Sequence, residues 1–598
     1  MIRWRLTLVA VSVTLAVQTL RALFPLVIYT YGAHATEVMR GAYLVVVFLA
    51  PLLAPALARL LNARRALTLA VGGLALFRLA AQVAPPGDAA LSLATIAAVL
   101  ALAALPLALR AIGATDELGI GIFWGLALDA ALNSAFVTWD YFWQRDTPAL
   151  VTALALSGLA ALALWQEQNR LLDMRPFKYA LPFLLGPAFL LEMLLLANPA
   201  YVAANTGFDL PIASAVVLLG LTLALAARSP RLAHPRMALV LSLLLLNNLT
   251  GIPAAVIILV AQTCLGYILF AELTSPAAFR PGAVRTAFSA AVGSLSFLVL
   301  LLLFHAADLV AIPLSVAPPL AGIVIALLVR QSVPTRLPFN WRVLPLPLFV
   351  VPLALWLTQP PLVIASAPSG AFRLFNYNVH QGANEAGWVD LEGLAAAIEA
   401  DSPDVVALQE ATRGQLANGS ADLAIWLSRR LRMPYVFAPA ITGYGNALLT
   451  RLPILAWDDG PLPRGEAEPR RYLRAQLDVG RAEPVAIIVT HLNHLSARNR
   501  IPQVERLLAV WNGAPRTLLV GDLNAQMEST EIMMIMEAGF ISAQDVTGHS
   551  DLFTFSSTYP RLRIDWIFGT PDITFSDFKI SPATASDHLP LAVTVRVE

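Results

Sequence analysis

Asp522 and Asn524 stand one residue apart, directly after the apolar run 517–520 and the single Gly521. The run predicts a short buried strand, and residues i and i+2 just beyond a strand end can face the same cleft. A carboxylate and a carboxamide placed there suit a hard cation, a bound water or a phosphate oxygen. Taken alone, Gly-Asp after a strand is more often an ordinary turn, so the pair needs support from the rest of the chain.

Polar residues follow other predicted strands between residues 372 and 598. They are Asn376, Asn378 and His380, Gln409 and Glu410, Tyr444 and Asn446, His491, Asp565, and Asp587 and His588. A lone His or Glu after a strand is usually a loop or core residue. So many polar strand ends within one domain form a far more specific pattern, and they indicate a shared site.

The elements that must position these residues alternate between strands and helices, which predicts a layered α/β domain. The predicted strands are 372–377, 405–408, 447–449, 473–477, 485–490, 517–520, 564–568 and 591–597, and the predicted helices are 391–400, 421–431, 501–511 and 530–538. The run 466–474 mixes charges of both signs and is predicted to be an exposed loop.

The motifs of residues 371–598, in this order, resemble the endonuclease/exonuclease/phosphatase superfamily, which has the DNase I-like fold. The resemblance implies a four-layer α/β sandwich and Mg²⁺-dependent phosphoester hydrolysis, with Mn²⁺ or Ca²⁺ as alternative cations. It also implies roles for individual residues. Glu410, Asn378 and Asp587 would bind the metal; Asp522 and Asn524 would position water and phosphate; His588 would be the catalytic histidine held by Asp565; His491 would bond a phosphate oxygen; Asn446 and Tyr444 would line the phosphate site.

These residue types agree with the chemistry of a phosphodiester. The substrate is anionic, so a cation on one or two carboxylates can neutralise charge while leaving positions open for water and phosphate. An Asp–His pair suits a general base or an electrostatic partner, because the carboxylate determines the imidazole tautomer. Arg500, together with Arg498 and Gln503, follows His491 and is a further candidate to bind phosphate, with a solvated helix face as the alternative.

The first part of the chain has a different composition from this domain. The whole sequence is 58% hydrophobic and 13% charged, with a mean hydropathy of +0.68. Residues 1–370 contain 21 Lys and Arg against 13 Asp and Glu, whereas residues 371–598 contain 19 against 26. We therefore expect a polytopic transmembrane domain at 1–360, a linker at 361–371 and the α/β domain at 372–598. The single cysteine, Cys264, lies in an apolar run and is interpreted as packing.

Apolar runs of spanning length recur along residues 1–360. They predict thirteen α-helical spans at 6–30, 41–58, 66–84, 90–112, 118–138, 149–165, 179–197, 210–227, 237–252, 253–273, 286–304, 309–329 and 343–360. The pair within 237–273 is read as two helices or as one broken helix. Basic residues fall on alternate connections, so the positive-inside rule places the amino end in the cytoplasm and the α/β domain outside or in a lumen. These connection residues include Arg59, Arg64, Arg170, Arg175, Arg228, Arg231, Arg280, Arg330 and Arg336.

Ionisable and amide groups within the predicted spans need partners or water. They are Arg21, Arg78, Asp129, Asn133, Glu192, His305 and Asp308. One interpretation is pairing between helices and snorkelling at helix ends. The other is a polar cavity that receives a lipid head group, for which Asp129 and Glu192 are the best candidates.

The two parts together bear on which phosphoester is cleaved. Nucleases usually present a basic surface to DNA, whereas this domain has a surplus of acidic residues, so nucleic acid is not the favoured partner. A membrane lipid explains both the phosphoesterase motifs and the spans, and no protein partner is indicated. The arrangement resembles the membrane proteins that remodel GPI-anchor lipids, which implies an inositol-phosphate or GPI-type linkage. An anchored nuclease or soluble-phosphate phosphatase, and a transporter or scaffold without turnover, are the alternatives.

Overall fold

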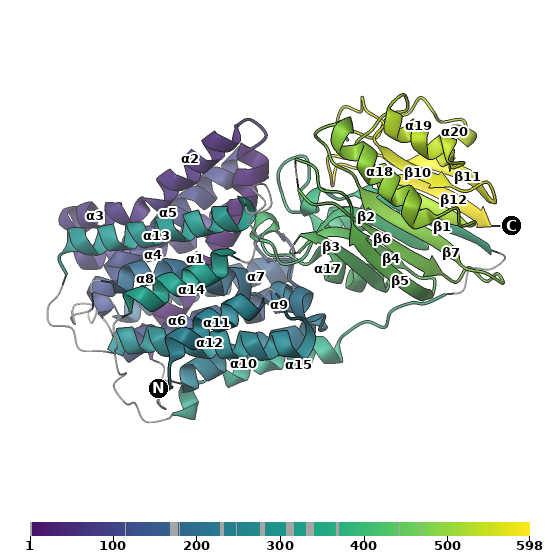
Figure 1. Ribbon diagram of the computed structural model, residues 1–598. Helices are drawn as coiled ribbons and strands as arrows, with labels where there is room; N and C mark the ends of the chain where they lie inside the picture. Colours follow the sequence, from purple (N-terminus) through teal and green to yellow (C-terminus); the bar gives the residue numbers. More distant parts are fainter. Residues whose placement is uncertain are drawn as a thin grey trace. The chain divides into compact units, whose positions relative to one another are not determined.

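The computed structural model describes residues 3–597 except 114, 168–177, 179, 228–231, 247, 275–280, 307–315, 330–339, 366–369, 442 and 467. The chain divides into a helical unit that ends at Thr358 and an α/β unit that begins at Gln359. Helices make up the first unit, and strands with covering helices make up the second (Figure 1). Asp308 and the arginines at 170, 175, 228, 231, 280, 330 and 336, on which the predicted topology partly depends, lie outside the described residues.

The helical unit begins at Trp4 and consists of fifteen labelled α-helices among its described residues. They are α1 (Trp4–Pro25), α2 (Glu37–Phe48), α3 (Ala54–Leu61), α4 (Ala63–Val83), α5 (Asp88–Ile112), α6 (Asp116–Ala135), α7 (Thr147–Glu167), α8 (Leu181–Leu191), α9 (Pro199–Thr206), α10 (Leu210–Ala226), α11 (Pro235–Leu246), α12 (Gly251–Thr274), α13 (Ala283–Ala306), α14 (Ala317–Leu328) and α15 (Val350–Leu357). The ambiguous stretch 237–273 is therefore two helices, α11 and α12, which pack against each other.

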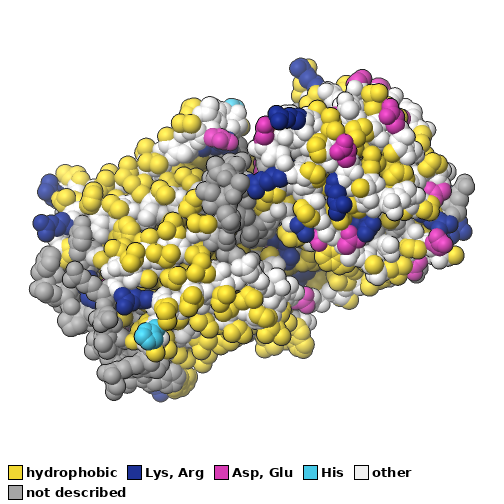
Figure 2. Space-filling view, in the orientation of Figure 1, with side chains coloured by type: hydrophobic (Ala, Val, Ile, Leu, Met, Phe, Trp, Pro, Cys, Tyr) yellow, Lys and Arg dark blue, Asp and Glu magenta, His cyan; other side chains and the backbone are white. Residues whose placement is uncertain are grey.

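The lengths of the described helices support fewer spans than the thirteen predicted. Among the described residues, eight helices are long and apolar enough to cross a membrane, or nine if the bent pair Leu181–Leu196 and Pro199–Thr206 counts as one span. The apolar helices Leu210–Ala226, Pro235–Leu246, Ala317–Leu328 and Leu346–Leu357 are shorter. A span needs about 20 residues to cross about 30 Å of hydrocarbon, so thirteen full spans are not supported. Hydrophobic side chains cover much of the visible face of this unit (Figure 2), as in a membrane protein.

Buried charges in the helical unit are paired between elements. Arg21 of α1 contacts Asp129 of α6 and donates from Nη1 to Oδ2 of Asp140 at 2.8 Å. Glu192 accepts a hydrogen bond of 2.7 Å from Gln262 of α12. These contacts are the pairing between helices that the first interpretation expects, and they tie α6 to α1 and α12 to the segment after α8.

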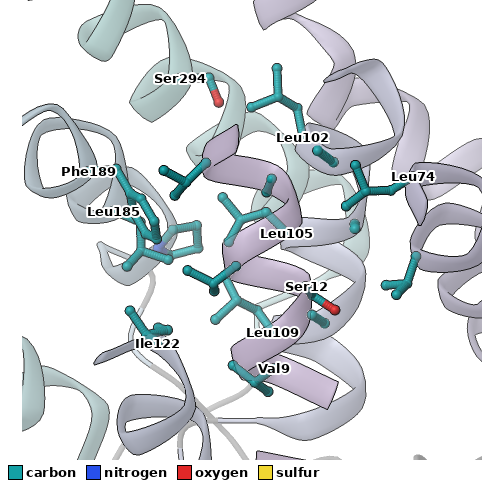
Figure 3. Close-up of a pocket in the computed structure, with 18 of the residues that line it drawn as sticks. Val9, Ser12, Leu74, Leu102, Leu105, Leu109, Ile122, Leu185, Phe189 and Ser294 are labelled. Carbon is teal, nitrogen blue, oxygen red and sulfur yellow. The ribbon is translucent and has the colours of Figure 1, made fainter. Parts of the chain in front are cut away.

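An apolar cavity of about 160 Å³ lies between helices of this unit (Figure 3). Val9 of α1, Leu105 of α5 and Phe189 of α8 are among the side chains that line it. Of the described residues that line it, only Ser12 and Ser294 are polar. Its chemistry suits a hydrocarbon chain rather than a head group.

The α/β unit contains two six-stranded sheets. Their strand orders are β11-β12-β1-β2-β4-β3 and β5-β6-β7-β8-β10-β9. The bounds are β1 (Ala371–Asn378), β2 (Val405–Thr412), β3 (Tyr435–Ile441), β4 (Tyr444–Thr450), β5 (Ile454–Pro461), β6 (Arg471–Leu477), β7 (Val485–His491), β8 (Thr517–Asp522), β9 (Ile541–Ser542), β10 (Asp565–Gly569), β11 (Ile573–Ile580) and β12 (Leu591–Val597). Sequence patterns did not predict β3, β5, β9 or β11.

The two sheets pack face to face, and helices cover their outer faces. Leu374 and Ala407 of the first sheet share one core cluster with Ile487 and Leu518 of the second. Helices α18 (Ala497–Trp511) and α19 (Thr530–Glu537) pack on the second sheet. Helices α16 (Leu391–Glu399) and α17 (Leu423–Leu431) pack together, and α17 contacts β2 and β3 of the first sheet. The short helix α20 (Ala543–Val546) contacts β10. The result is the predicted four-layer order, helix, sheet, sheet, helix.

Strand pairing brings the polar strand ends together. Asn378 of β1 pairs with Gln409 of β2 in parallel register. In the second sheet, Asp522 of β8 pairs with His491 of β7 on one side and with Asp565 of β10 on the other. Residues separated by up to 43 positions in the sequence therefore become immediate neighbours.

Candidate active site

His588 and Asp565 form a buried pair at the centre of the candidate site. Nδ1 of His588 lies 2.9 Å from Oδ2 of Asp565, and Nε2 lies 3.6 Å from Oδ2 of Asp522. All three side chains are buried. Burial alone would lower the pKa of His588, but the two carboxylates outweigh it and raise the pKa to about 10. At neutral pH the ring is therefore an imidazolium, with Nδ1–H donating to Asp565 and Nε2–H directed toward Asp522.

Asp522 is held by neighbours on both of its carboxylate oxygens. Asn378 donates from Nδ2 to Oδ2 at 3.0 Å, and the backbone N–H of Asn524 donates to Oδ1 at 2.9 Å. Burial, followed by the charge of Asp565, raises the pKa of Asp522 to about 7. A carboxylate with that pKa can exchange a proton near neutral pH, as a general base must.

Gly521 is required by the close approach of β8 to β7. A Cβ at this position would lie 1.9 Å from the carbonyl oxygen of Thr490, and the backbone φ is +149°. Asn524 also has a positive φ of +50°, which asparagine tolerates better than most residues. The Gly-Asp-Leu-Asn sequence is thus a tight exit from β8 that turns Asp522 and Asn524 into the site.

Arg470 is a site residue that sequence reasoning missed. Its side chain is buried, and Nη1 lies 3.1 Å from the hydroxyl of Tyr444 and 2.9 Å from Nδ1 of His491. The prediction of an exposed loop at 466–474 is therefore wrong for Arg470, and Arg471 begins β6. The mixed charges of residues 466–474 suggested an exposed loop. The arginine pair shortly before the predicted strand 473–477 was the one feature that could have indicated a cation at the site.

The contact with Arg470 determines the tautomer of His491. A guanidinium can only donate, so Nδ1 of His491 accepts and the ring hydrogen lies on Nε2. Nε2 lies 3.4 Å from Oδ2 of Asp522 and 3.1 Å from Nδ2 of Asn524. Burial, reinforced by the positive charge of Arg470, lowers the pKa of His491 well below its usual value. His491 is therefore a neutral donor.

The residues assigned to the metal lie at the end of the first sheet. Ser586 donates to the backbone oxygen of Asn378 at 2.7 Å, which places the following residue, Asp587, beside β1. Glu410 has a positive φ of +56° at a register shift in β2. A bulge of this kind re-aims a side chain, and Glu410 follows Gln409, the partner of Asn378.

The donor set fits a hard divalent cation. Two carboxylates and a carboxamide are oxygen donors, which Mg²⁺, Mn²⁺ and Ca²⁺ accept. Asp522, Asp565 and His588 also bring ligand atoms within 4.8 Å of one another. His588 there is engaged with Asp565 through Nδ1, so this group has the residue types for proton exchange, whereas Glu410, Asn378 and Asp587 offer oxygen donors that would suit a cation.

The three residues assigned to phosphate have different surroundings. Tyr444 is buried with its hydroxyl on Arg470. Asn446 is buried and donates to the backbone oxygen of Arg471 at 2.8 Å. Arg500 instead donates from Nε to Glu531 at 2.6 Å and joins α18 to α19. Gln503 is buried and bonds the backbone of Asn493. The structure thus places Tyr444 in contact with Arg470 of the site, whereas Arg500 serves an ion pair between helices.

Comparison with known proteins identifies the family of the α/β unit, which is called the catalytic unit from here on. Residues 376–588 form an endonuclease/exonuclease/phosphatase family domain, which confirms the family that the motifs resemble; members of this family hydrolyse phosphoester bonds. The matched region contains every site residue described above. The helical unit precedes this domain in the chain.

Solved structures similar to the chain include an endonuclease/exonuclease/phosphatase from Beutenbergia cavernae, with 23% identity over 38% of this chain and 72% of that chain, at a TM-score of 0.33. A family protein from Bacteroides thetaiotaomicron shows 14% identity over 38% and 98% of the two chains, with a TM-score of 0.33. TDP2 of D. rerio, solved with a single-strand DNA product, shows 18% identity over 38% and 99%, with a TM-score of 0.32. No curated protein matches the chain in sequence.

Proposed function

We propose that the protein is a membrane-embedded, divalent-metal-dependent phosphodiesterase that acts on the head-group linkage of a phospholipid. The observation that carries the proposal is the joining, in one chain, of the buried Asp522–Asp565–His588 group with eight helices long and apolar enough to span a bilayer. A lipid phosphodiester is the substrate class that needs both. The apolar cavity lined by Val9, Leu105 and Phe189 adds a place in the helical unit that suits a lipid chain.

The site residues divide the work of hydrolysis between them. Asp522, with its pKa near 7, accepts a proton from the attacking water, and Asn524 helps to orient that water. His588, held by Asp565, presents a charged N–H to a phosphate oxygen or to the leaving oxygen. His491 presents a neutral N–H whose position Arg470 determines. A cation on Glu410, Asn378 and Asp587 would supply neutralisation of the phosphate charge.

The resemblance to GPI-lipid-remodelling proteins makes an inositol-phosphate or GPI-type head group the first substrate class to test. With the amino end in the cytoplasm, an odd number of spans, as in the count of nine that joins the bent pair, puts the catalytic unit on the extracytoplasmic or lumenal side in this proposal. Transfer of the head group to another lipid alcohol is the corresponding alternative to hydrolysis, because either acceptor can attack the same phosphorus.

The experiment is a head-group release assay with the full chain reconstituted in vesicles of phosphatidylinositol and phosphatidylcholine with Mg²⁺. We expect a phosphorylated head group to be released, and we expect Glu410→Ala and His588→Ala to abolish the release. Glu483→Ala changes an exposed acidic residue that pairs with Arg516 and serves as the matched control. Cleavage of DNA or of a soluble phosphate ester with no effect on lipid would instead establish an anchored nuclease or phosphatase. Absence of every turnover would favour a transporter or scaffold.

A further inference from the structure

Exposed apolar side chains of the catalytic unit are concentrated on one segment beside the active site. Between residues 371 and 597, ten large hydrophobic side chains of the described chain are exposed, and four of them lie within residues 552–562. These four are Leu552, Phe553, Tyr559 and Leu562, with exposed fractions of 37, 44, 64 and 37%. Apolar residues gathered in this way mark an interaction surface more often than scattered ones do.

This segment, which we name the 552–562 hairpin, has a defined backbone. The N–H groups of Thr554 and Phe555 donate to the carbonyl oxygen of Leu562, and Leu562 donates back to Phe555. The guanidinium of Arg561 stacks on the ring of Tyr559 at 4.1 Å. The exposed side chains are therefore carried on a closed turn, with an aromatic hydroxyl and a cation beside the apolar groups.

The 552–562 hairpin is also attached directly to the catalytic histidine. The ring of Phe555 packs on the ring of His588 with centroids 4.8 Å apart. Ser557 donates from its backbone N–H to the carbonyl oxygen of Asp587 at 2.7 Å, and Leu589 donates to Thr554 at the same distance. Whatever contacts the outer side of the hairpin is thus one side chain away from the site.

We propose that the 552–562 hairpin docks into the interface of a lipid bilayer and so brings the active site to head groups at the membrane surface. Phe and Leu enter the boundary between head groups and hydrocarbon, Tyr occupies the head-group level, and Arg561 meets lipid phosphate. The inference rests on the proposed lipid substrate, because only such a substrate requires the site to lie at the interface.

The connection between the units keeps the catalytic unit within reach of the membrane. The second unit begins at Gln359, and the backbone N–H groups of Val363 and Ala365 donate to the carbonyl oxygens of Arg432 and Arg451. Residues 358–362, which precede these hydrogen bonds, reach at most about 18 Å when fully extended. The chain therefore holds the catalytic unit close to the apolar helices of the helical unit, as docking at a bilayer surface requires.

The test labels one introduced cysteine at a time, so the single cysteine of the chain is first replaced by Cys264→Ala. Tyr559→Cys is then labelled with an environment-sensitive fluorophore, and the full chain is reconstituted in vesicles that contain spin-labelled phosphatidylcholine. Leu455→Cys is the matched control, because Leu455 is 58% exposed on β5 at the end opposite the site, next to Ile454, which pairs with Leu477. We expect at least threefold stronger quenching at 559 than at 455. Equal quenching at both positions overturns the docking.

A second measurement separates the docking from the proposed function. Phe553→Ser with Tyr559→Ser should lower turnover of vesicle phospholipid at least fivefold, mainly through KM, and leave hydrolysis of soluble bis(p-nitrophenyl) phosphate unchanged. Leu455→Ser should change neither rate. Selective quenching at 559 without any lipid turnover would uphold the docking and refute the proposed function. Lipid turnover that the double substitution leaves unchanged would overturn the docking and uphold the function.

Discussion

Nη1 of Arg470 lies 2.9 Å from Nδ1 of His491, and this contact decides which nitrogen of the ring carries its hydrogen. The guanidinium has no acceptor, so Nε2 of His491 must be the donor, and it faces Oδ2 of Asp522 at 3.4 Å. Arg470 is thus a positioning residue: it acts on the reaction through His491 and Tyr444 rather than by touching the reacting atoms itself.

Replacement of Arg470 should impair catalysis without unfolding the domain. A hydrogen bond to a charged group contributes about 1.5–3 kcal/mol, so we expect Arg470→Met to lower kcat/KM on a soluble phosphodiester about 10–100-fold. Arg470→Lys, which keeps a donor, should restore part of the loss. Because Arg470 lowers the pKa of His491, its removal should also move the acid limb of the pH–rate profile to higher pH. The control is Arg471→Met, which breaks a half-exposed pair with Asp459.

Asp565 should be needed for the orientation and charge of His588. In Asp565→Asn the ring loses its carboxylate partner, so its pKa falls and its tautomer is no longer determined. We expect kcat to fall about 10²–10⁴-fold, the contribution of one acid–base group, with little change in KM. Asp545→Asn is the matched control, because Asp545 lies on the nearby α20 and pairs with Arg563. Equal losses in both variants would assign the effect to folding.

The stability of the catalytic unit should decrease in acid because of His491. Its pKa in the folded protein is below the value near 6.5 of the unfolded chain. The unfolded state therefore binds a proton first as the pH falls, so this contribution to stability is present above pH 6.5 and is lost below it. We expect the Tm of the unmodified chain to fall more steeply between pH 6.5 and 4.5 than that of His491→Gln, as followed by tryptophan fluorescence. His549→Gln should keep the steep profile.

Removal of divalent cations should abolish turnover, and their addition should stabilise the folded chain. A ligand that binds only the native state raises stability by RT ln(1 + [L]/Kd), which is about 2.7 kcal/mol at 100 times Kd. We expect EDTA to stop hydrolysis and Mg²⁺ to restore it and to raise the Tm. Glu410→Gln should lose both effects in the same concentration range. A Tm rise that persists in Glu410→Gln would assign the cation to other residues.

The ion pair between Arg21 and Asp129 should hold the helical unit together rather than receive substrate. Removing one partner of a buried pair leaves an uncompensated charge, at a cost of about 3–5 kcal/mol, so Arg21→Met should lower the yield of folded protein sharply. Arg21→Met combined with Asp129→Asn and Asp140→Asn, which removes both carboxylates that Arg21 pairs with, should recover much of that yield. Turnover per folded molecule should stay unchanged in Asp129→Asn and in Glu192→Gln. A selective loss of lipid turnover in either variant would favour a head-group cavity there.

The local chemistry of this protein could be predicted from its sequence. Gly521, Asp522 and Asn524 follow a short apolar run, which can be buried when its backbone groups are hydrogen-bonded in a sheet. Their position at a strand end could therefore be predicted. Apolar runs likewise predicted helices in the first part. The strand-end prediction and the helix prediction both depend on patterns over a few neighbouring residues. The order of the polar strand-end motifs was sufficient to indicate the family.

Only the tertiary structure decided the relationships between distant residues. Among the described residues, eight or nine helices reach spanning length rather than the thirteen predicted, because the ends of a helix depend on Pro, Gly and packing as well as on hydropathy. Arg470 was expected to be exposed because its neighbours in the sequence are charged. It directly precedes β6, which pairs with β7, and its side chain therefore reaches His491 at the end of β7. Arg500 was expected at phosphate but pairs with Glu531, 31 residues away. Pairing across sheets and helices is a long-range property, so the sequence by itself determined which groups could react, and the fold determined which of them meet.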